Sequence, residues 1–258
     1  MMHSNVLDSR SIGLGDAFGQ RFMKPGIYRY NLDRPGGGRM SDEYPYEIRV
    51  NESPADHAMH QETVLVGYRK RRLSPDRPQL DIQVGDLVVW APTGSDVPRF
   101  EVAGEQEFFG SAVMQNECGY SHAFGLSGTY RWRDATGGPA MGVVKVKDPK
   151  VDTTSGLERW KKKLANAQLV MIHDGKVDPA EVSIEMGQTV YFAVVNGTGV
   201  TVTDEQLLAG DGTYQDKPKD QDKPTYEDKP KDQDKPKVKK AKAKKSKKPS
   251  TQGKGKKS

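Results

Sequence analysis

The sequence predicts an all-β fold followed by a long charged tail. Residues 61–148 contain short runs rich in aliphatic and aromatic residues, such as "ETVLVGY", "LDIQVGDLVVW" and "GTYRW", separated by Gly and Pro. This spacing is typical of a β-sandwich. Two other segments repeat parts of this region, which indicates a second unit of the same kind. From Thr213 onward the chain has almost no apolar side chains, so we expect the tail to be disordered.

The charge is divided unequally along the chain. The whole sequence of 258 residues has a net charge of +5, and residues 213–258 contain 17 Lys against 7 acidic residues. Residues 1–212 therefore carry a net charge of −5, with 23 basic and 28 acidic residues. The basic character belongs to the tail, and the body is mildly acidic.

The single cysteine, Cys118, excludes a disulfide framework within the chain. The N-terminal sequence "MMHSNVLDSRS" has no apolar core of a signal peptide, and no later run has the length of a membrane span. We therefore expect a cytoplasmic protein without a transmembrane segment.

The central unit, 61–148, begins with strands that are easy to recognise. Leu80, Ile82 and Val84 alternate with polar residues, Gly85-Asp86 forms a turn, and a strand ending at Trp90 follows.

The flanking segments repeat the two halves of this unit in reverse order. "GQRFMKPGIYRY" (19–30) parallels "SHAFGLSGTYRW" (121–132), and "VDPAEVSIEMGQTVYF" (177–192) parallels "LSPDRPQLDIQVGDLVVW" (73–90). We therefore expect residues 1–50 to supply the C-terminal half of a second sandwich and residues 166–212 to supply its N-terminal half. The two halves would combine into a permuted domain within one chain, or between chains in a swapped assembly.

The remaining segments are a linker and a two-part tail. In 149–165, Thr154 or Ser155 would cap a short helix with Leu157, Trp160 and Leu164 on one face. Residues 213–236 contain a twelve-residue repeat, "TYQDKPKDQDKP" and "TYEDKPKDQDKP", which predicts an extended spacer. Residues 237–258 form a Lys-rich tail with no acidic residue.

The body resembles the cupredoxins of the plastocyanin and azurin kind, through "VGDLVVW", "SHAF", "GTYRW" and "MGVVKV". The resemblance implies tandem Greek-key β-sandwiches, of which the second is the permuted one. It also implies which positions would ligate copper, and most of these positions hold residues that are not copper ligands. In the central unit Arg99 is nearest to the place of the first His, and Asp134 stands at the Cys position. In the N-terminal half the Cys position is Leu32. A blue-copper site needs two imidazoles and a thiolate, so we expect no cofactor.

Other residues could form an unconventional metal or redox site. The weak candidates are Cys118, His122 and Met141, with Met114 as an alternative to Met141. The simpler interpretation is that Cys118 and His122 are not ligands. His57 and His60 have metal-like spacing, but the segment after Pro54 is typical of a loop.

The loops at 32–40 and 134–141 replace the copper-binding loops of the resembled family, where docking takes place. The resemblance therefore implies a protein contact through a set of charged residues there: Arg34, Arg39, Arg99, Arg133 and Asp134. A glycine-rich anion nest at Arg34 and Arg39 is an alternative.

The sequence contains no serine-hydrolase elbow, phosphate-binding loop or zinc-protease pair, so we expect no enzymatic activity. The tail resembles linker-histone-like basic arms, and such lysines bind phosphates without reading sequence. The leading hypothesis is a copper-free scaffold that binds a polyanion, most simply DNA or RNA, while the sandwiches contact a protein or another copy. The alternatives are a metal or electron-transfer protein, a self-assembling structural protein, or a tail that serves solubility. The expected polyanion-binding residues are Lys237, Lys239, Lys240, Lys242, Lys244, Lys245, Lys247, Lys248, Lys254, Lys256 and Lys257.

Overall fold

A computed structural model describes residues 7–41, 44–105, 109–197 and 199–209, and these residues form a mostly β structure. The first half of the chain contributes eight strands: β1 (Asp16–Arg21), β2 (Gly26–Asp33), β3 (Tyr46–Asn51), β4 (Gln61–Arg69), β5 (Arg72–Pro75), β6 (Gln79–Gln83), β7 (Leu87–Pro92) and β8 (Glu101–Gly104). The second half contributes β9 (Cys118–Ala123), β10 (Gly128–Asp134), β11 (Met141–Lys147), β12 (Gln168–His173), β13 (Lys176–Asp178), β14 (Glu181–Glu185), β15 (Thr189–Asn196) and β16 (Val202–Asp204). The all-β prediction is confirmed at this level.

The two halves have the same topology. One four-stranded sheet has the order β6-β3-β2-β8, and the other has the order β14-β11-β10-β16. Each strand of the second sheet corresponds to the strand of the first sheet whose number is lower by eight, so that β10 corresponds to β2. The eight-stranded sheet has the order β13-β12-β15-β9-β1-β7-β4-β5. Strands at equal distances from the central pair, β9 and β1, again correspond to each other, as β15 does to β7. The structure is therefore a tandem duplication, with eight strands in each copy.

Each four-stranded sheet packs its aromatic side chains against the large sheet. Tyr30 of β2 lies edge-on to Trp90 of β7 with ring centroids 5.3 Å apart, and Trp132 of β10 lies edge-on to Phe192 of β15 at 5.2 Å. All four residues are fully buried. Contacts between aromatic rings in this geometry add to the hydrophobic gain of burial, and they give each half the core of a β-sandwich.

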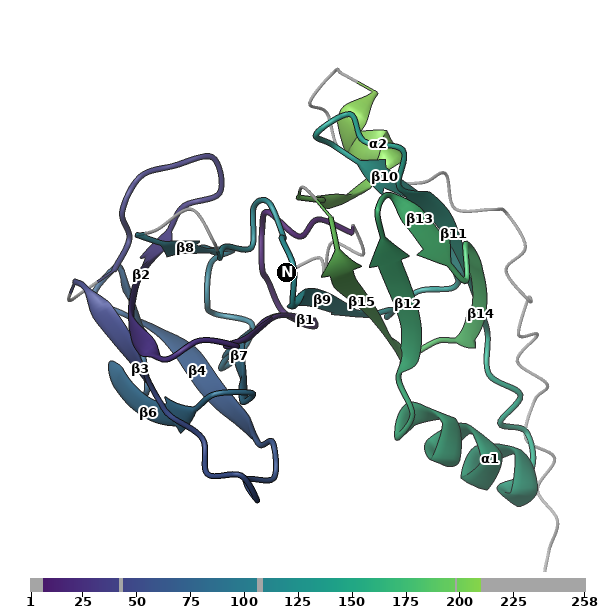
Figure 1. Ribbon diagram of the computed structural model, residues 1–258. Helices are drawn as coiled ribbons and strands as arrows, with labels where there is room; N and C mark the ends of the chain where they lie inside the picture. Colours follow the sequence, from purple (N-terminus) through teal and green to yellow (C-terminus); the bar gives the residue numbers. More distant parts are fainter. Residues whose placement is uncertain (1–6, 42–43, 106–108, 198, 210–258) are drawn as a thin grey trace, which may run out of the picture. The chain divides into compact units, whose positions relative to one another are not determined.

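The two halves meet in the antiparallel pair of β1 and β9, at the centre of the large sheet (Figure 1). The register places Asp16 opposite His122, Phe18 opposite Tyr120, and Gln20 opposite Cys118. Because β9 is the counterpart of β1, this pairing relates the two copies by an approximate two-fold axis. The Asp16–His122 contact at one end of the pair therefore occupies the position that the Gln20–Cys118 contact occupies at the other end.

The strand pairing differs from the permuted arrangement expected from the sequence. The N-terminal strands β2 and β3 pair with β8 and β6, not with strands from 166–212. Likewise β10 and β11 pair with β16 and β14, so 61–148 is not one complete sandwich. The first sandwich is built from strands between Asp16 and Gly104, and the second from strands between Cys118 and Asp204.

The reason lies in the nature of a repeat. Gly26 and Gly128, and likewise Gly85 and Gly187, are each 102 positions apart. Such repeated positions define the period of the duplication, but they are equally compatible with a repeat unit that starts at β1 and with one that starts at β4. Hydrogen bonding between strands decides between these starting points.

A helix is present where the sequence predicted one, α1 (Thr154–Leu164), and a short helix, α2 (Glu205–Leu208), follows β16. The prediction that 149–165 links two domains is wrong, because α1 connects β11 to β12 within the second sandwich. The N-cap of α1 is Thr153, one residue before the expected cap, and its hydroxyl accepts a hydrogen bond from the Gly156 amide. On the predicted apolar face, Trp160 donates from Nε1 to the Met186 carbonyl at 2.8 Å. This contact fixes α1 against the turn before β15.

None of the helices in the described part of the chain combines the length and apolarity that a membrane span requires. The expected spacer (213–236) and the Lys-rich tail (237–258) lie outside the described residues, so their expected disorder stays a prediction.

Candidate functional site

Cys118, the first candidate metal ligand, is engaged in the interior of the structure. It is the first residue of β9, it is 2% exposed, and its Sγ donates to Oε1 of Gln20 at 2.7 Å. Burial raises the pKa of the Cys118 thiol to about 12. The thiolate is the form that binds metals and reacts, so this environment opposes both roles.

His122, the second candidate, is paired with a buried carboxylate. Its Nδ1 lies 2.5 Å from Oδ1 of Asp16, and both side chains are almost wholly inaccessible to solvent. Tyr120 donates its hydroxyl to the same carboxylate oxygen at 2.8 Å, and burial raises the pKa of Tyr120. Nε2 of His122 is buried without a hydrogen-bond partner among the described atoms.

The structure does not bring the three metal candidates together. Cys118 and His122 are four residues apart on one strand, which separates their Cα atoms by about 13 Å at ~3.3 Å per residue. Met141 begins β11 in a different sheet and is 58% exposed. Met114 is buried and forms a bridge with Val200. Across the described ranges, no cluster of three or more His, Cys, Asp or Glu has the arrangement of a metal site.

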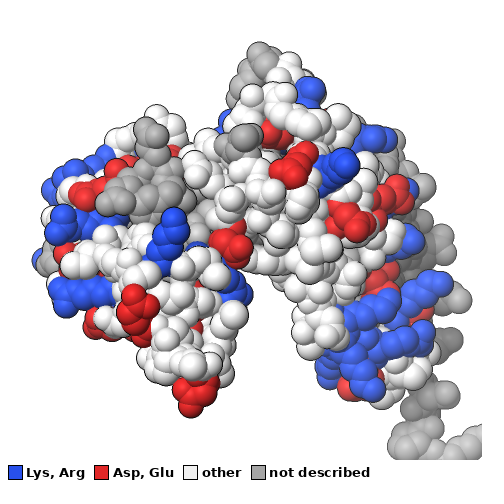
Figure 2. Space-filling model, in the orientation of Figure 1, with Lys and Arg blue, Asp and Glu red and all other residues white. Residues whose placement is uncertain are grey.

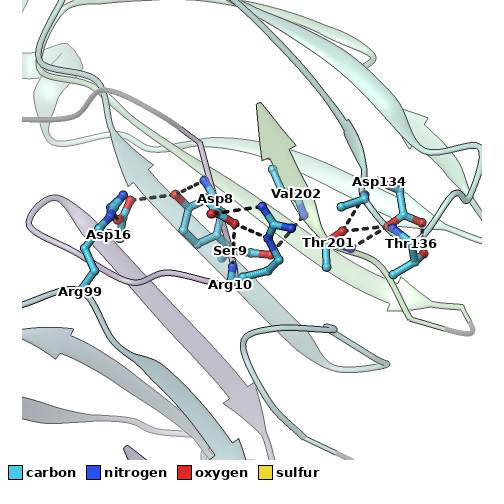
Figure 3. Close-up of polar contacts among 11 residues, drawn as sticks. Asp8, Ser9, Arg10, Asp16, Arg99, Asp134, Thr136, Thr201 and Val202 are labelled. Atoms are coloured by element: carbon cyan, nitrogen blue, oxygen red, sulfur yellow. Dashed lines mark hydrogen bonds and ion pairs between the residues drawn. The ribbon is translucent and has the colours of Figure 1, made fainter. Parts of the chain in front are cut away.

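Asp134, which the resemblance noted in the sequence aligns with a copper-ligating Cys, organises the loop after β10. Its carboxylate accepts hydrogen bonds from the Thr201 amide and hydroxyl at 3.0 Å, and from the Thr136 hydroxyl at 2.7 Å (Figure 3). Burial raises the pKa of Asp134, but these hydrogen bonds outweigh it, and the net shift is downward. The residue therefore ties β10 to the segment that leads into β16.

Polar contacts between this loop and Asp16 form a series that is linked through two pairs of sequence neighbours, Asp8-Ser9 and Thr201-Val202 (Figure 3). The amide of Asp8 donates to the Tyr120 hydroxyl at 3.3 Å. The next residue, Ser9, forms two hydrogen bonds with Val202 of β16: Ser9 N to the carbonyl at 3.0 Å, and Val202 N to Ser9 Oγ at 3.2 Å. Because its groups satisfy one another in this way, the series acts as a structural network that holds the N-terminal segment on the second sandwich.

The second histidine pair also has a structural explanation. Nε2 of His57 lies 2.8 Å from Oδ1 of Asp86, and the same oxygen accepts from the His60 amide at 2.8 Å. In the second sandwich Gln188 replaces Asp86 and donates to the Lys163 carbonyl at the end of α1. In both copies the side chain at this position forms hydrogen bonds with the segment that precedes the fourth strand, which is β4 in the first copy and β12 in the second.

The expected docking residues are dispersed. Arg34 and Arg39 are exposed on the turn after β2, and Arg133 is exposed on β10. Arg99 lies 3.4 Å from Oδ2 of Asp16 and so belongs to the central network. Of the five residues, only Arg34 and Arg39 share one surface loop.

A run of basic residues next to that loop was not predicted to be functional. Arg69–Arg72 is exposed at the hairpin between β4 and β5. Four consecutive basic residues were visible in the sequence, but their position beside Arg39 depends on the pairing of β5 with the 40–41 segment. The eleven expected polyanion-binding lysines lie beyond the described part of the chain.

Comparison with protein-family models, with curated proteins and with solved structures gave no match. The resemblance to cupredoxins therefore rests on the motifs in the sequence.

Proposed function

We propose that this chain is a non-catalytic binding protein in which a copper-free, cupredoxin-like double sandwich carries a polycationic tail. The observation that carries the proposal is the segregation of charge. Residues 237–258 contain 11 Lys and no acidic residue, whereas residues 1–212 carry a net charge of −5. A run of lysines binds a polyanion by neutralising phosphates and releasing counterions, and it does so without sequence specificity. The polyanion we propose is nucleic acid.

The geometry of the body supports a scaffold role over a copper-based one. Cys118 and His122 each have an internal partner, Gln20 and Asp16 respectively, and Met141 lies on another sheet. A blue-copper centre requires a thiolate and two imidazoles close together. The cupredoxin relationship is part of the proposal, and the placement of its motifs is compatible with it: "GTYRW" and "MGVVKV" begin β10 and β11, and "SHAF" covers the end of β9 and the residue after it.

The experiment is fluorescence anisotropy with a labelled duplex DNA and a labelled single-stranded RNA. The natural chain is compared with a full-length variant in which all eleven tail lysines are Gln, which keeps the length of the tail and removes its charge. We expect tight binding of both probes by the natural chain and a large fall in affinity for the variant. Equal affinity of the two proteins would overturn the proposal.

A copper titration tests the main alternative. The natural chain is mixed with Cu(II) and its visible spectrum recorded, because a Cu–thiolate centre is strongly coloured and a Lys-rich tail is not. The proposal predicts no intense visible band, and the same spectrum from a Cys118→Ala variant. An intense band that disappears in Cys118→Ala would favour the metal protein.

A further inference from the structure

The hairpin between β4 and β5 has an unusual turn. Lys70 and Arg71, its two central residues, have φ angles of +48° and +66°, in the left-handed region. A two-residue hairpin turn of this type favours Asn-Gly or Asp-Gly, because other side chains are strained there. In addition, Arg69 and Arg72 lie directly opposite each other, and like charges across a strand pair repel.

The second sandwich contains the same hairpin with the ordinary residues. Between β12 and β13 the turn residues are Asp174 and Gly175, with φ angles of +48° and +74°. The fold therefore needs only Asp-Gly at this point. In the first copy these positions hold two cations in spite of the strain, and strain that is retained at an exposed turn points to a function outside folding.

The surroundings of the hairpin increase its positive charge. Leu73 N donates to the Met40 carbonyl at 2.8 Å, and Arg72 Nη1 donates to the Ser41 carbonyl at 3.2 Å. These bonds hold the basic hairpin against the loop that carries Arg34 and Arg39. We define this set as the basic hairpin surface: Arg34, Arg39, Arg69, Lys70, Arg71 and Arg72, all of them exposed.

The tip of the hairpin differs from the loop in its partners. Within the described ranges, no carboxylate forms an ion pair with Arg69, Lys70 or Arg71, whereas the exposed Lys163 pairs with Glu185. In the loop, Arg39 interacts with the Asp33 carboxylate and lies over the ring of Tyr44. Basic side chains gather on this half of the structure, at the left of Figure 2, and again over α1. The mildly acidic body thus contains a local region of opposite sign.

We propose that the basic hairpin surface binds the phosphate backbone of duplex DNA, as a second contact beside the tail. The proposal rests on the function proposed above and extends it to the folded body. Arg is favoured here for a physical reason: its planar guanidinium donates two parallel hydrogen bonds to one phosphate. A two-stranded β-ribbon also fits the major groove of B-form DNA, whereas the deep, narrow major groove of duplex RNA excludes it.

The test replaces the strained turn with residues that the fold prefers. In Lys70→Asn/Arg71→Gly the hairpin has an Asn-Gly turn, and we expect the thermal midpoint of unfolding to rise by roughly 2–4 °C. We expect the affinity for a labelled 20-base-pair DNA duplex to fall, by roughly tenfold or more at 0.1 M salt. The slope of log K against log[salt] should become shallower by about 0.9 for each phosphate that the variant no longer neutralises.

The control removes the same charge elsewhere. Arg159→Gln/Lys162→Gln changes two exposed cations on α1 and lowers the net charge by the same two units. All proteins are full-length, and each pair of substitutions is made in the natural chain and in the chain with the eleven tail lysines changed to Gln. The second background isolates binding by the body from binding by the tail.

The outcomes separate the two proposals. If the tail-neutralised chain still binds DNA at 0.05 M salt and the turn substitution abolishes that binding, the basic hairpin surface is the second contact. The inference is wrong if the tail-neutralised chain does not bind DNA, or if Arg159→Gln/Lys162→Gln lowers its affinity as much as the turn substitution does. Either result leaves the proposed binding by the tail intact. An equal fall in affinity with poly-glutamate as the probe would assign the surface to an acidic protein and overturn the inference. Failure of the proposed function would show instead as equal affinities of the natural and tail-neutralised chains.

Discussion

Asp16 and His122 form the most enclosed ionisable pair at the junction of the two sandwiches. Asp16 also accepts the Tyr120 hydroxyl and the Gly13 amide, at 2.8 Å each. Asp16→Ala would leave these groups buried without a partner, so we expect the free energy of unfolding to fall by about 3–5 kcal/mol. Urea unfolding followed by circular dichroism measures this change. Asp96→Ala, at an exposed acidic residue, is the control and should change the free energy of unfolding by less than about 0.5 kcal/mol. If Asp16→Ala and Asp96→Ala had equal effects, the Asp16–His122 pair would not contribute to stability.

Cys118 should be unreactive in the native protein. With a pKa raised to about 12 by burial, the thiol stays protonated at pH 8. We expect iodoacetamide to modify Cys118 only after unfolding in urea, as followed by mass spectrometry. Rapid modification of the folded chain at pH 8 would contradict the burial of this residue.

The same shift gives a pH dependence of stability. The folded pKa is higher than the unfolded one, so the stabilisation from the neutral thiol is complete below pH ~8.5 and is lost as pH rises toward about 12. Cys118→Ala should remove this contribution to the pH dependence. The test compares urea midpoints of the two proteins between pH 8 and pH 11; parallel profiles would contradict the raised pKa.

The sequence identified these residues but not their roles. Cys118 and His122 stand out as a possible ligand pair, because a thiol and an imidazole four positions apart suggest metal chemistry. Their partners, Gln20 and Asp16, are about a hundred positions away, and only the register of β1 with β9 places them in contact. No local pattern in the sequence contains that register.

At the scale of elements, Gly187 lies where α1 meets the turn before β15. It has a φ of +91°, and a Cβ there would be 2.8 Å from Cδ2 of Leu164. Gly137 has a φ of +89° with no atom within 4 Å of its Cβ position, so it shares the backbone strain without the clash. We expect Gly187→Ala to destabilise the protein by about 1–3 kcal/mol more than Gly137→Ala. Thermal unfolding of the two variants gives the difference, and equal costs would mean that α1 does not pack on this turn.

Elements were more predictable than their partners. The alternation in "LDIQVGDLVVW" correctly predicts β6, the turn at Gly85 and β7, because one buried face leaves a local period of two. The helix was predicted within one residue of its cap. The pairing of β2 with β8 and of β10 with β16 was not, since a duplicated sequence offers each strand two equivalent sets of partners.

At the scale of the whole molecule, the eight-stranded sheet and the buried core extend through both sandwiches. We therefore expect the described part of the chain to unfold as one cooperative unit. Trp132→Phe/Trp160→Phe leaves Trp90 as a fluorescence reporter of the first sandwich, and Trp90→Phe/Trp160→Phe leaves Trp132 as a reporter of the second. In each variant the urea transition by fluorescence should coincide with that by far-UV circular dichroism. Separate transitions would show that β1 and β9 do not couple the two halves.

The whole chain combines an acidic body with a strongly basic end, and this division was fully visible in the composition. What composition does not reveal is that the body has a basic region of its own, because that region is assembled from a hairpin and a loop that lie about thirty positions apart. The second contact that we propose lies on this region, beside the one proposed for the tail.

The most direct test of the central claim is the salt dependence of duplex DNA binding by the natural chain and by a chain that ends at Gly212. With eleven lysines available, the natural chain should show a slope of log K against log[salt] of about −4 or steeper. The shorter chain should bind more weakly and with a clearly shallower slope. Identical slopes, or no binding by the natural chain at 0.15 M salt, would contradict the proposal that this protein is a polyanion-binding scaffold.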